Sequence, residues 1–450
     1  MKPMPWRILV LTEAGKDSGE AIRLDASGAD GWLAASDAKA DVPKPGGGTV
    51  TLAPREQSGF TPAAVSAALG AGANAAAIDA ALHAPAFQRL ESAWRGLALL
   101  AREAGDAVAI DVQSVPRKGL AQRFRDTAFA RERTAADPIA LIVADYDFSH
   151  KGDDLATFAE LASMAMTLQA PLVANASAGF FDFRYFVQVS ALPEMLPRLN
   201  TPQHQAWRDF QKTEPARWAA LTINRWLQRA PYAAGAGGHA ETAADSNPDS
   251  FLWGRGGWLV AAAVARSVKQ HGHALALSGS QGGNFSGVAT RPWAVNANTT
   301  APLATEGTVA EMAVLELSRA AFTPVIGPLR ASAVLLPMVV TTFRLNPGKL
   351  TVEGTLAYQL MAGRLAQFCG RLLEEMPAAD AATVAQFFRT ELVGFLGPLA
   401  GEQPDGAVTV ELQEQKSDAG SETFAAVRIK PPVQLEGKPI DFEFGLPVRL

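Results

Sequence analysis

The parallel core of this protein is predicted from residues 138–175, which read PIALIVADYDFSHKGDDLATFAELASMAMTLQAPLVAN. The stretch opens with a continuous apolar run at 139–144, which is typical of a strand buried on both faces. Apolar side chains then recur every three or four residues from 155 to 168, which predicts a helix of about four turns. A second apolar run starts at Leu172. Strand, crossover helix and strand imply parallel pairing, so the sequence predicts an α/β fold.

An acidic segment lies between the first strand and the helix, and it contains Asp145, Asp147, Asp153 and Asp154. Open α/β sheets usually bind ligands at the carboxyl ends of their strands, and carboxylate oxygens are ligands for hard cations. One hypothesis is therefore a metal-assisted hydrolase that uses Asp145, Asp147 and Asp153. The alternative is a solvated turn in which Asp153 or Asp154 caps the helix. No glycine-rich phosphate loop accompanies the acids, which favours the alternative.

The composition narrows the class of protein. The chain has 450 residues, a formal net charge of −5 and 48% hydrophobic residues. It can therefore build a large core, in one elaborated domain or in two or three, and is not globally disordered. No apolar run is long enough to span a bilayer and the amino terminus lacks a secretory signal, so we expect a cytoplasmic protein without membrane insertion. The mild acidity argues against a nucleic-acid partner.

The remaining pattern predicts mixed helices and strands, followed by a C-terminal segment of a different kind. Strands are expected at 7–11, 49–52, 108–112 and 274–277. Helices are expected at 63–81 with a break near Gly70, and at 85–102, 120–133, 253–270, 351–375 and 382–396. The segments 40–48 and 231–247 are expected to be loops. Alternating runs at 407–413, 424–430 and 440–444 predict an antiparallel ribbon.

The remaining motifs predict neither a metal nor a cofactor. The segment 279–287, GSQGGNFSG, lacks the ending of a phosphate loop, which favours a tight turn, and a small-molecule site there is the weaker reading. His271 and His273 favour a helix end over a metal site, because no further ligands lie nearby. The single cysteine, Cys369, excludes an intramolecular disulfide and a thiolate metal cluster. No set of nucleophile, base and orienting group is evident.

Six segments together resemble a known family. In order along the chain they are FQRLESAWRGL (87–97), ADYDFSHKGD (144–153), the segment 207–232 with LTINRWLQRAPY, FLWGRGGW (251–258), GSQGG (279–283) and the segment 431–447. Their order resembles that of the large sheath subunit of type VI secretion systems, the TssC/VipB family, over about residues 75–450. WRILVL (6–11) and FTPAAV (60–65) resemble a shortened small sheath subunit, TssB/VipA.

The resemblance implies a sheath-subunit fold, with a parallel or mixed sheet flanked by helices and a C-terminal antiparallel ribbon. It implies a structural, non-enzymatic function, in which copies of the chain form sixfold rings stacked helically around an inner-tube protein on a baseplate. Contraction then drives the tube outward. A separate small sheath subunit and an AAA+ unfoldase are further partners of the family. Two departures are the apparent fusion at the front and Asn284, which replaces a third consecutive glycine.

The resemblance also suggests domains and contact residues. We expect a small-subunit-like segment with a Pro/Gly-rich linker at 1–72, a large-subunit-like body at 73–406 and the ribbon at 407–450. Because sheaths of the family are meshed by exchanged strands, one predicted set joins protomers: Arg7, Ile8, Leu9, Val10 and Leu11 of one copy against Phe424, Val427, Ile429, Ile440, Phe442 and Phe444 of another. The family's tube-facing contact comes from a helix, and the two charged candidates here are 120–133 and 351–375. We favour the second, which would face the tube through Arg364 and Arg371.

Overall fold

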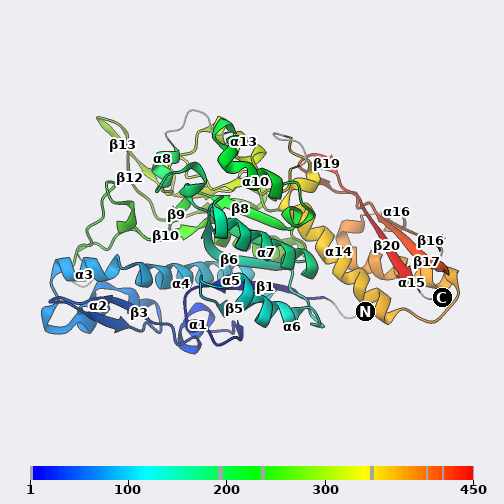
Figure 1. Cartoon of the computed structure of the whole chain (residues 1–450), viewed down its shortest axis with the longest axis horizontal. Coiled ribbons are helices and arrows are strands. Elements are labelled where there is room, and N and C mark those ends of the chain that lie inside the picture. Colours follow the sequence, from blue (N-terminus) through cyan, green and yellow to red (C-terminus); the bar gives the residue numbers. More distant parts are fainter. Residues whose placement is uncertain are drawn as a thin grey trace.

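The structure is a computed structural model that describes residues 4–190, 196–234, 239–344, 349–401, 404–417 and 420–448. Three parts follow one another along its longest axis: amino-terminal helices, a central sheet with helices on both faces, and a C-terminal module of helices and a β ribbon (Figure 1). None of the described helices is long and apolar enough to cross a bilayer.

The central sheet confirms the α/β prediction. Its strand order is β14-β8-β7-β6-β1-β5-β2. The pairings from β14 to β5 are parallel, and only the short β2 joins its neighbour antiparallel. In chain order the strands are β1 (Trp6–Thr12), β2 (Ile22–Arg23), β5 (Val108–Ser114), β6 (Leu141–Phe148), β7 (Leu172–Ala176), β8 (Ala219–Ile223) and β14 (Phe322–Pro324).

Strand β1 lies in the interior of this sheet. It pairs with β5 from Trp6 to Thr12 and with β6 from Ile8 to Leu11. Ile8 and Val10 pack into the core on one face, and Leu9 and Leu11 pack into the core on the other. Both edges of β1 are therefore occupied by its own chain. This corrects the expectation that residues 7–11 add to the ribbon of a neighbour, and it makes β1 part of the body's sheet.

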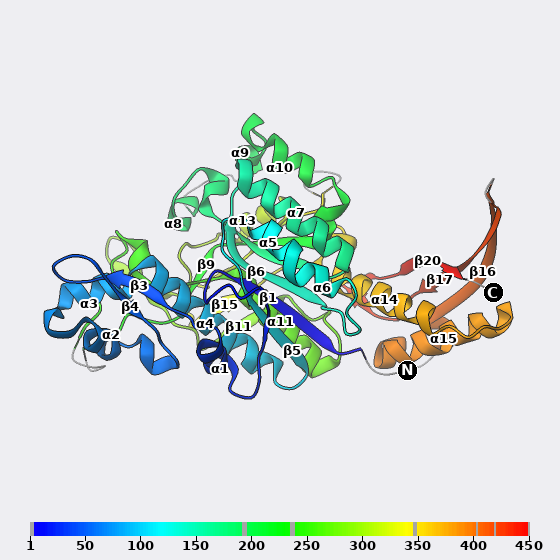
Figure 2. The ribbon, with the colours of Figure 1, turned by 60° about the horizontal axis from the view of Figure 1, so that its bottom comes forward.

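Helices cover both faces of the sheet (Figure 2). On one face lie α5 (Leu120–Phe124), α6 (Ala130–Glu132) and α7 (Gly152–Leu168), with a π-helical turn between the first two. On the other face lie α4 (Pro85–Ala104) and α11 (Gly256–His271), which pack against each other and against β5, β6 and β7. The unit β6-α7-β7 has the predicted connection, although β6 continues to Phe148 and so contains Asp145 and Asp147.

The amino-terminal part packs on α4 through small elements: α1 (Gly28–Ala35), β3 (Ala40–Pro43), β4 (Thr49–Leu52), α2 (Pro62–Leu69) and α3 (Ala75–Leu82). The expected loop at 40–48 is partly wrong, because its first residues form β3, which pairs antiparallel with β4. The turn between them holds three consecutive glycines with positive φ, at 46–48. The Thr61 hydroxyl caps α2 by accepting from the backbone N–H of Ala64 at 3.3 Å.

Short elements make up most of the secondary structure in the chain between β7 and α14. They are α8 (Phe186–Val189), α9 (Leu196–Leu199), α10 (Gln205–Phe210), β9 (Arg225–Leu227), β10 (Trp253–Arg255), α12 (Gly279–Gly282), β11 (Asn284–Ser286), β12 (Arg291–Asn296), β13 (Thr299–Leu303), α13 (Glu311–Arg319) and β15 (Ala333–Leu335). The expected strand at 274–277 is wrong, since these residues form a loop between α11 and α12.

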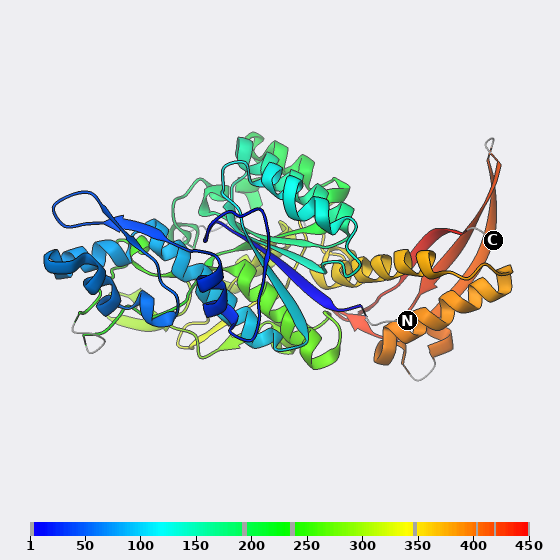
Figure 3. The same cartoon turned by 90° about the horizontal axis from the view of Figure 1, so that it is seen from below.

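The C-terminal module confirms the predicted ribbon. It begins with α14 (Leu356–Glu375) and α15 (Ala381–Leu396) and continues through α16 (Pro404–Ala407), β16 (Val408–Ser417), β17 (Gly420–Ile429), β18 (Gln434–Leu435), β19 (Lys438–Pro439) and β20 (Phe442–Val448). The antiparallel ribbon β16-β17-β20 packs on α14 and α15. It projects from the body at the end opposite α2 and α3 (Figure 3).

The close contact between α4 and α11 predicts that one methyl group added at this contact destabilises the protein. Gly96 of α4 lies against the fully buried ring of Trp258, where an added Cβ would clash. We expect Gly96→Ala to lower the free energy of unfolding by about 1–3 kcal/mol through overpacking. Gly370→Ala in α14 is the matched control, because nothing lies within 4 Å of its Cβ. Denaturant titration of both variants tests this, and equal stability would contradict the assigned packing.

Candidate functional site

The carboxyl ends of the parallel strands carry a buried ionic lock. Asp145 is 4% exposed. Its carboxylate accepts hydrogen bonds from Trp258 Nε1 at 2.9 Å, Thr12 Oγ1 at 3.2 Å and Arg255 Nη1 at 3.2 Å. The other terminal nitrogen of Arg255 pairs with Asp147 at 3.0 Å. One guanidinium therefore joins two carboxylates of β6 to the residue that precedes α11.

Burial acts on both partners of this ion pair, and it raises the pKa of Asp145, an effect that Arg255 offsets only in part. Burial lowers the pKa of Arg255, but the carboxylates of Asp147 and Asp145 outweigh burial and raise it. The guanidinium therefore stays protonated at any ordinary pH. Desolvating charged groups is costly unless they are paired and hydrogen-bonded, and this arrangement meets both conditions.

The acidic residues do not converge on one site. Asp153 is exposed in the first turn of α7, and the N-cap residue of that helix is Lys151. Asp154 accepts from the backbone N–H of Ser149 at 3.0 Å, which ties down the turn before the helix. No group of three or more potential metal-ligating side chains occurs in the part of the chain that the structure describes. The hydrolase hypothesis is therefore unsupported, because Asp145 and Asp147 are held by an arginine and Asp153 points elsewhere.

The motif FLWGRGGW supplied the partner that sequence reasoning missed. Its Arg255 and Trp258 complete the lock, and the N–H of Gly257 donates to Asn175 Oδ1 at 2.9 Å. A Cβ at Gly256 would strike Thr222 of β8 at 2.7 Å, so glycine lets α11 start against the sheet. The GSQGG motif is explained in the same way, since side chains at 282 and 283 would clash with backbone carbonyls. Both motifs therefore serve close packing.

A second buried network fixes the segment after β9 to α4. Arg229 Nε donates to Glu91 at 2.8 Å and its Nη1 donates to Glu241 at 2.6 Å. His83 Nε2 lies 3.1 Å from Glu241. Burial raises the pKa of Glu241, but the hydrogen bonds from His83 and Arg229 outweigh burial and bring it to about 2. This carboxylate therefore stabilises the folded protein only while it is ionised.

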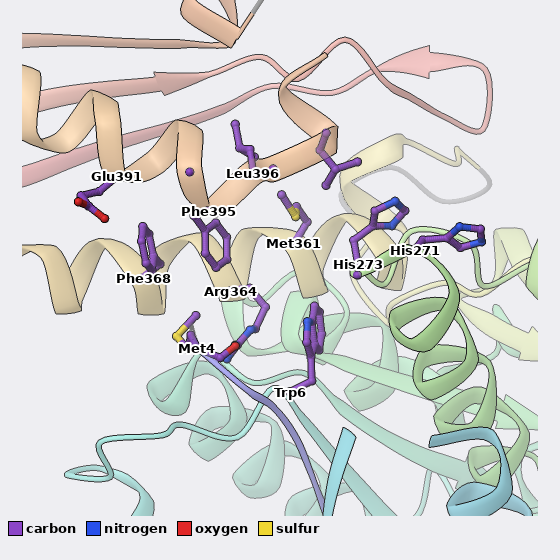
Figure 4. A pocket seen from close by; sticks show the side chains of 14 residues that line it. Met4, Trp6, His271, His273, Met361, Arg364, Phe368, Glu391, Phe395 and Leu396 are labelled. Atoms are coloured by element: carbon purple, nitrogen blue, oxygen red, sulfur yellow. The ribbon is translucent and has the colours of Figure 1, made fainter. Parts of the chain in front are cut away.

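A third arrangement joins the C-terminal module to the body along α14 (Figure 4). Arg364 is 1% exposed, and its Nη2 donates to the carbonyls of Met4 at 2.8 Å and Pro5 at 3.0 Å. Gln367 Nε2 donates to the carbonyls of Ile139 and Leu168 at 2.8 and 3.0 Å. These side chains share one face of the helix. They form a polar seam that fastens α14 to the start of β1 and to the ends of β6 and α7.

This seam corrects the prediction that Arg364 and Arg371 face an inner tube. Burial lowers the pKa of Arg364 to about 9, and both of its nearest carbonyl partners belong to its own chain. Arg371 Nη2 likewise donates to the carbonyl of Ala136 at 3.1 Å. A helical pattern with spaced arginines does not reveal whether their guanidinium groups face water or backbone carbonyls. Beside the seam, a cavity of about 510 Å³ opens between α14 and α15.

The ribbon residues predicted to join protomers pack instead on their own helices. Val427, Ile429, Ile440 and Phe442 are buried in the core that includes α14 and α15, and Phe444 packs against it. Phe424 is half-buried in the central strand. What the ribbon leaves open are the backbone edges of β16 and β20, each of which pairs on one side only in the described strands.

Comparison with known proteins points to one family. Residues 74–335 match the family described as VipB: EvpB/VC_A0108, tail sheath N-terminal domain. The type VI secretion system sheath protein TssC1 of Pseudomonas aeruginosa is 25% identical over 230 residues. That match covers 46% of this chain and 46% of the relative, so the chain spans less than half of the curated relative's length.

Solved structures of sheath proteins are also similar. The helical sheath of the anti-feeding prophage in its contracted state aligns with 100% of this chain and 91% of its own, with 10% identity and a TM-score of 0.47. A sheath tail protein from Desulfitobacterium hafniense aligns with 99% of this chain and 97% of its own, with 10% identity and a TM-score of 0.43.

The polar seam predicts that Arg364 is required to hold the module on the body. We expect Arg364→Ala to lower the free energy of unfolding by about 2 kcal/mol or more, because buried carbonyls lose their donor. Faster amide hydrogen exchange should appear in α14 and at the start of β1. Arg428→Ala in β17 is the control, since that side chain is half exposed and pairs only at the surface with Glu443. Equal effects of the two substitutions would refute the role of the seam.

Glu241 predicts a specific acid sensitivity. Its folded pKa of about 2 lies below the ordinary value of 4.5, so its contribution is complete above pH 4.5 and is lost as the pH falls towards 2. The full contribution corresponds to about 3 kcal/mol. Unfolding titrations from pH 6 to pH 3 should show a smaller acid loss in Glu241→Gln than in the parent. The exposed Glu214→Gln should behave as the parent, and an unchanged acid loss in Glu241→Gln would contradict the assignment.

Proposed function

We propose a function for this chain from the fact that it belongs to the VipB family of tail sheath proteins. It is a structural, non-enzymatic subunit of a contractile sheath in a type VI secretion-like injection apparatus. Copies stack as sixfold rings around an inner-tube protein on a baseplate, and contraction drives the tube outward. The proposal places the subunit in the cytoplasm.

The observation that carries this proposal is the three-stranded ribbon with two open edges. An open edge presents a row of unpaired N–H and C=O groups, which is how extended segments of other chains are captured. The ribbon projects from the body and is attached through α14 and α15 (Figure 3). A strand added to the ribbon would hold neighbours together while the bodies change their relative positions.

The ionic lock supports a structural role over a catalytic one. At the sheet edge where α/β enzymes bind substrates, Asp145 and Asp147 are committed to Arg255. Releasing Asp145 for chemistry would take a partner away from a buried ion pair, which is strongly destabilising. This edge serves to fix α11 to the sheet.

The position of β1 bears on the source of the added strand. Because β1 is paired on both sides within its own sheet, it is not available as the added strand. We propose a separate small sheath subunit as the chain that supplies this strand, with an AAA+ unfoldase as the partner that recycles the contracted sheath. The likeness of residues 1–72 to a shortened small subunit is part of the same proposal, with β1 of that segment built into the sheet of the body.

Electron microscopy tests the assembly directly. We expect the purified chain, co-expressed with its small sheath subunit, to form rings or tubes with sixfold symmetry. Sedimentation at micromolar concentration should show large species alongside the free subunit. Discrete monomers in micrographs and in sedimentation, with and without the small subunit, would refute the sheath proposal.

A pair of proline variants tests whether the ribbon edge is the contact. Phe424 of the central strand β17 lies between Pro447 of β20 and Gln413 of β16. Pro447 has no N–H to donate, so Phe424 cannot form a hydrogen-bonded pair with it. The N–H and C=O of Phe424 therefore point towards Gln413. The next residue, Glu414, therefore directs its N–H towards the free edge. We expect Glu414→Pro to keep the thermal midpoint of the parent but to prevent polymer formation.

The neighbouring position is the matched control. Gln413→Pro removes a bond of the ribbon's own ladder, so we expect it to lower the thermal midpoint as well as polymer yield. Both side chains are exposed, which makes the backbone the main difference between the variants. Normal tubes from Glu414→Pro would show that this edge is not used.

A further inference from the structure

A pocket of about 500 Å³ beside α10 is lined by side chains of one sign of charge. It is built from α9, α10, the end of α13 and the residue Arg344. Four cationic side chains line it, Arg208, Lys212, Arg319 and Arg344, and the described part of its lining contains no carboxylate. Concave sites lined by one sign of charge focus the field and attract the opposite charge.

Arg344 belongs to this cluster, and backbone carbonyls of the described residues accept the hydrogen bonds of its guanidinium group. It is 6% exposed. Its Nη2 donates to the carbonyl of Ser318 at 2.6 Å, and its Nε donates to that of Arg319 at 3.2 Å. Burial lowers the pKa of Arg344 to about 10, so the group remains protonated at neutral pH. A carbonyl oxygen accepts the hydrogen bond of an N–H group but carries only a partial negative charge, so it does not neutralise the guanidinium group of Arg344.

The other three cations are equally poorly neutralised. Arg208 Nη1 donates to the carbonyls of Leu199 at 2.7 Å and Thr201 at 2.8 Å. Lys212 lies 3.5 Å from Asp209, but both side chains are more than half exposed, and such a surface pair is worth little. Arg319 is exposed in the last turn of α13, and it makes no ion pair within the described part of the chain.

A purely structural explanation accounts for only part of this cluster. Arg344 caps the carboxyl end of α13, where the helix dipole contributes about half a negative charge. That offsets half of one cation and explains why an arginine is placed there. The same dipole favours Arg319 in the last turn of α13, but it does not explain why Arg208 and Lys212, from the segment of α10, converge on the same cavity. About two to three positive charges remain after the dipole and Asp209 are counted.

We propose that this pocket binds an organic phosphate, with its phosphate on the cationic cluster and its organic body against the apolar wall. Arginine forks match phosphate oxygens in pairs, and charge-assisted bonds of this kind are the strong ones. The pocket is within the size range of small-molecule sites and too large for a phosphate alone. Leu196, Leu199 and Ala320 supply the apolar part of its lining. The proposal is independent of the sheath function.

Calorimetry on the full chain at fixed ionic strength tests the proposal. The probes are phenyl phosphate, inorganic phosphate and phenol, which separate the phosphate from the organic body. We expect saturable binding of one phenyl phosphate per chain, at least tenfold weaker binding of inorganic phosphate and no measurable binding of phenol. No saturable binding of phenyl phosphate at millimolar concentration would overturn the proposal. Equal affinity for the two phosphates would overturn the organic body as part of the ligand.

Two exposed cations locate the site without disturbing the fold. We expect the double variant Lys212→Gln, Arg319→Gln to keep the parent's thermal midpoint and to bind phenyl phosphate at least tenfold more weakly. Arg184→Gln is the matched control, because that guanidinium is 75% exposed and lies outside the pocket. Unchanged affinity in the double variant, or an equal loss in the control, would overturn the assignment of the ligand to this pocket.

Discussion

The structure depends on the ion pairs that Arg255 makes with Asp145 and Asp147. Asp145 is buried and Arg255 nearly so, and burying such groups is costly unless they are paired and hydrogen-bonded, as they are here. The lock joins β6 to the start of α11, and the ring of Trp258 then fills the space against Gly96 of α4. The packing of the two long helices on this face follows from that connection, and the edge where an enzyme would bind its substrate is closed by it.

Local patterns were sufficient to predict much of the fold. The β6-α7-β7 unit, the helices α4, α14 and α15 and the C-terminal ribbon each have a period or a cap that can be read without knowing the neighbours. The position of β1 could not be read in this way, because a short apolar strand fits the middle of a sheet and a free arm equally well. Its partners β5 and β6 lie more than a hundred residues away in sequence. The sequence of a seven-residue strand does not reveal which distant strands it pairs with.

The candidate site was predicted less well, for a related reason. Asp145 and Asp147 were recognised as unusual, but their partner Arg255 is distant in sequence and its motif gave no sign of charge pairing. Arg364 looked like a surface residue, because charged side chains are rarely buried without a carboxylate. Backbone carbonyls of Met4 and Pro5 replace that carboxylate, and every residue has such a carbonyl, so the sequence gives no signal for this role. The sequence therefore shows which charged residues are unusual, but it does not show which groups they bind in the folded protein.

Pro447 has a consequence for the symmetry of any assembly built on the ribbon. A segment that adds beyond β16 meets ten residues without a proline, whereas one that adds beyond β20 meets a missing donor. The two edges are therefore chemically unequal, and one of them is the better acceptor. Lattices that grow by capture at a single preferred edge are polar, with two distinguishable ends. A polar lattice can be started at one end and stopped at the other, which a ribbon with equivalent edges does not provide.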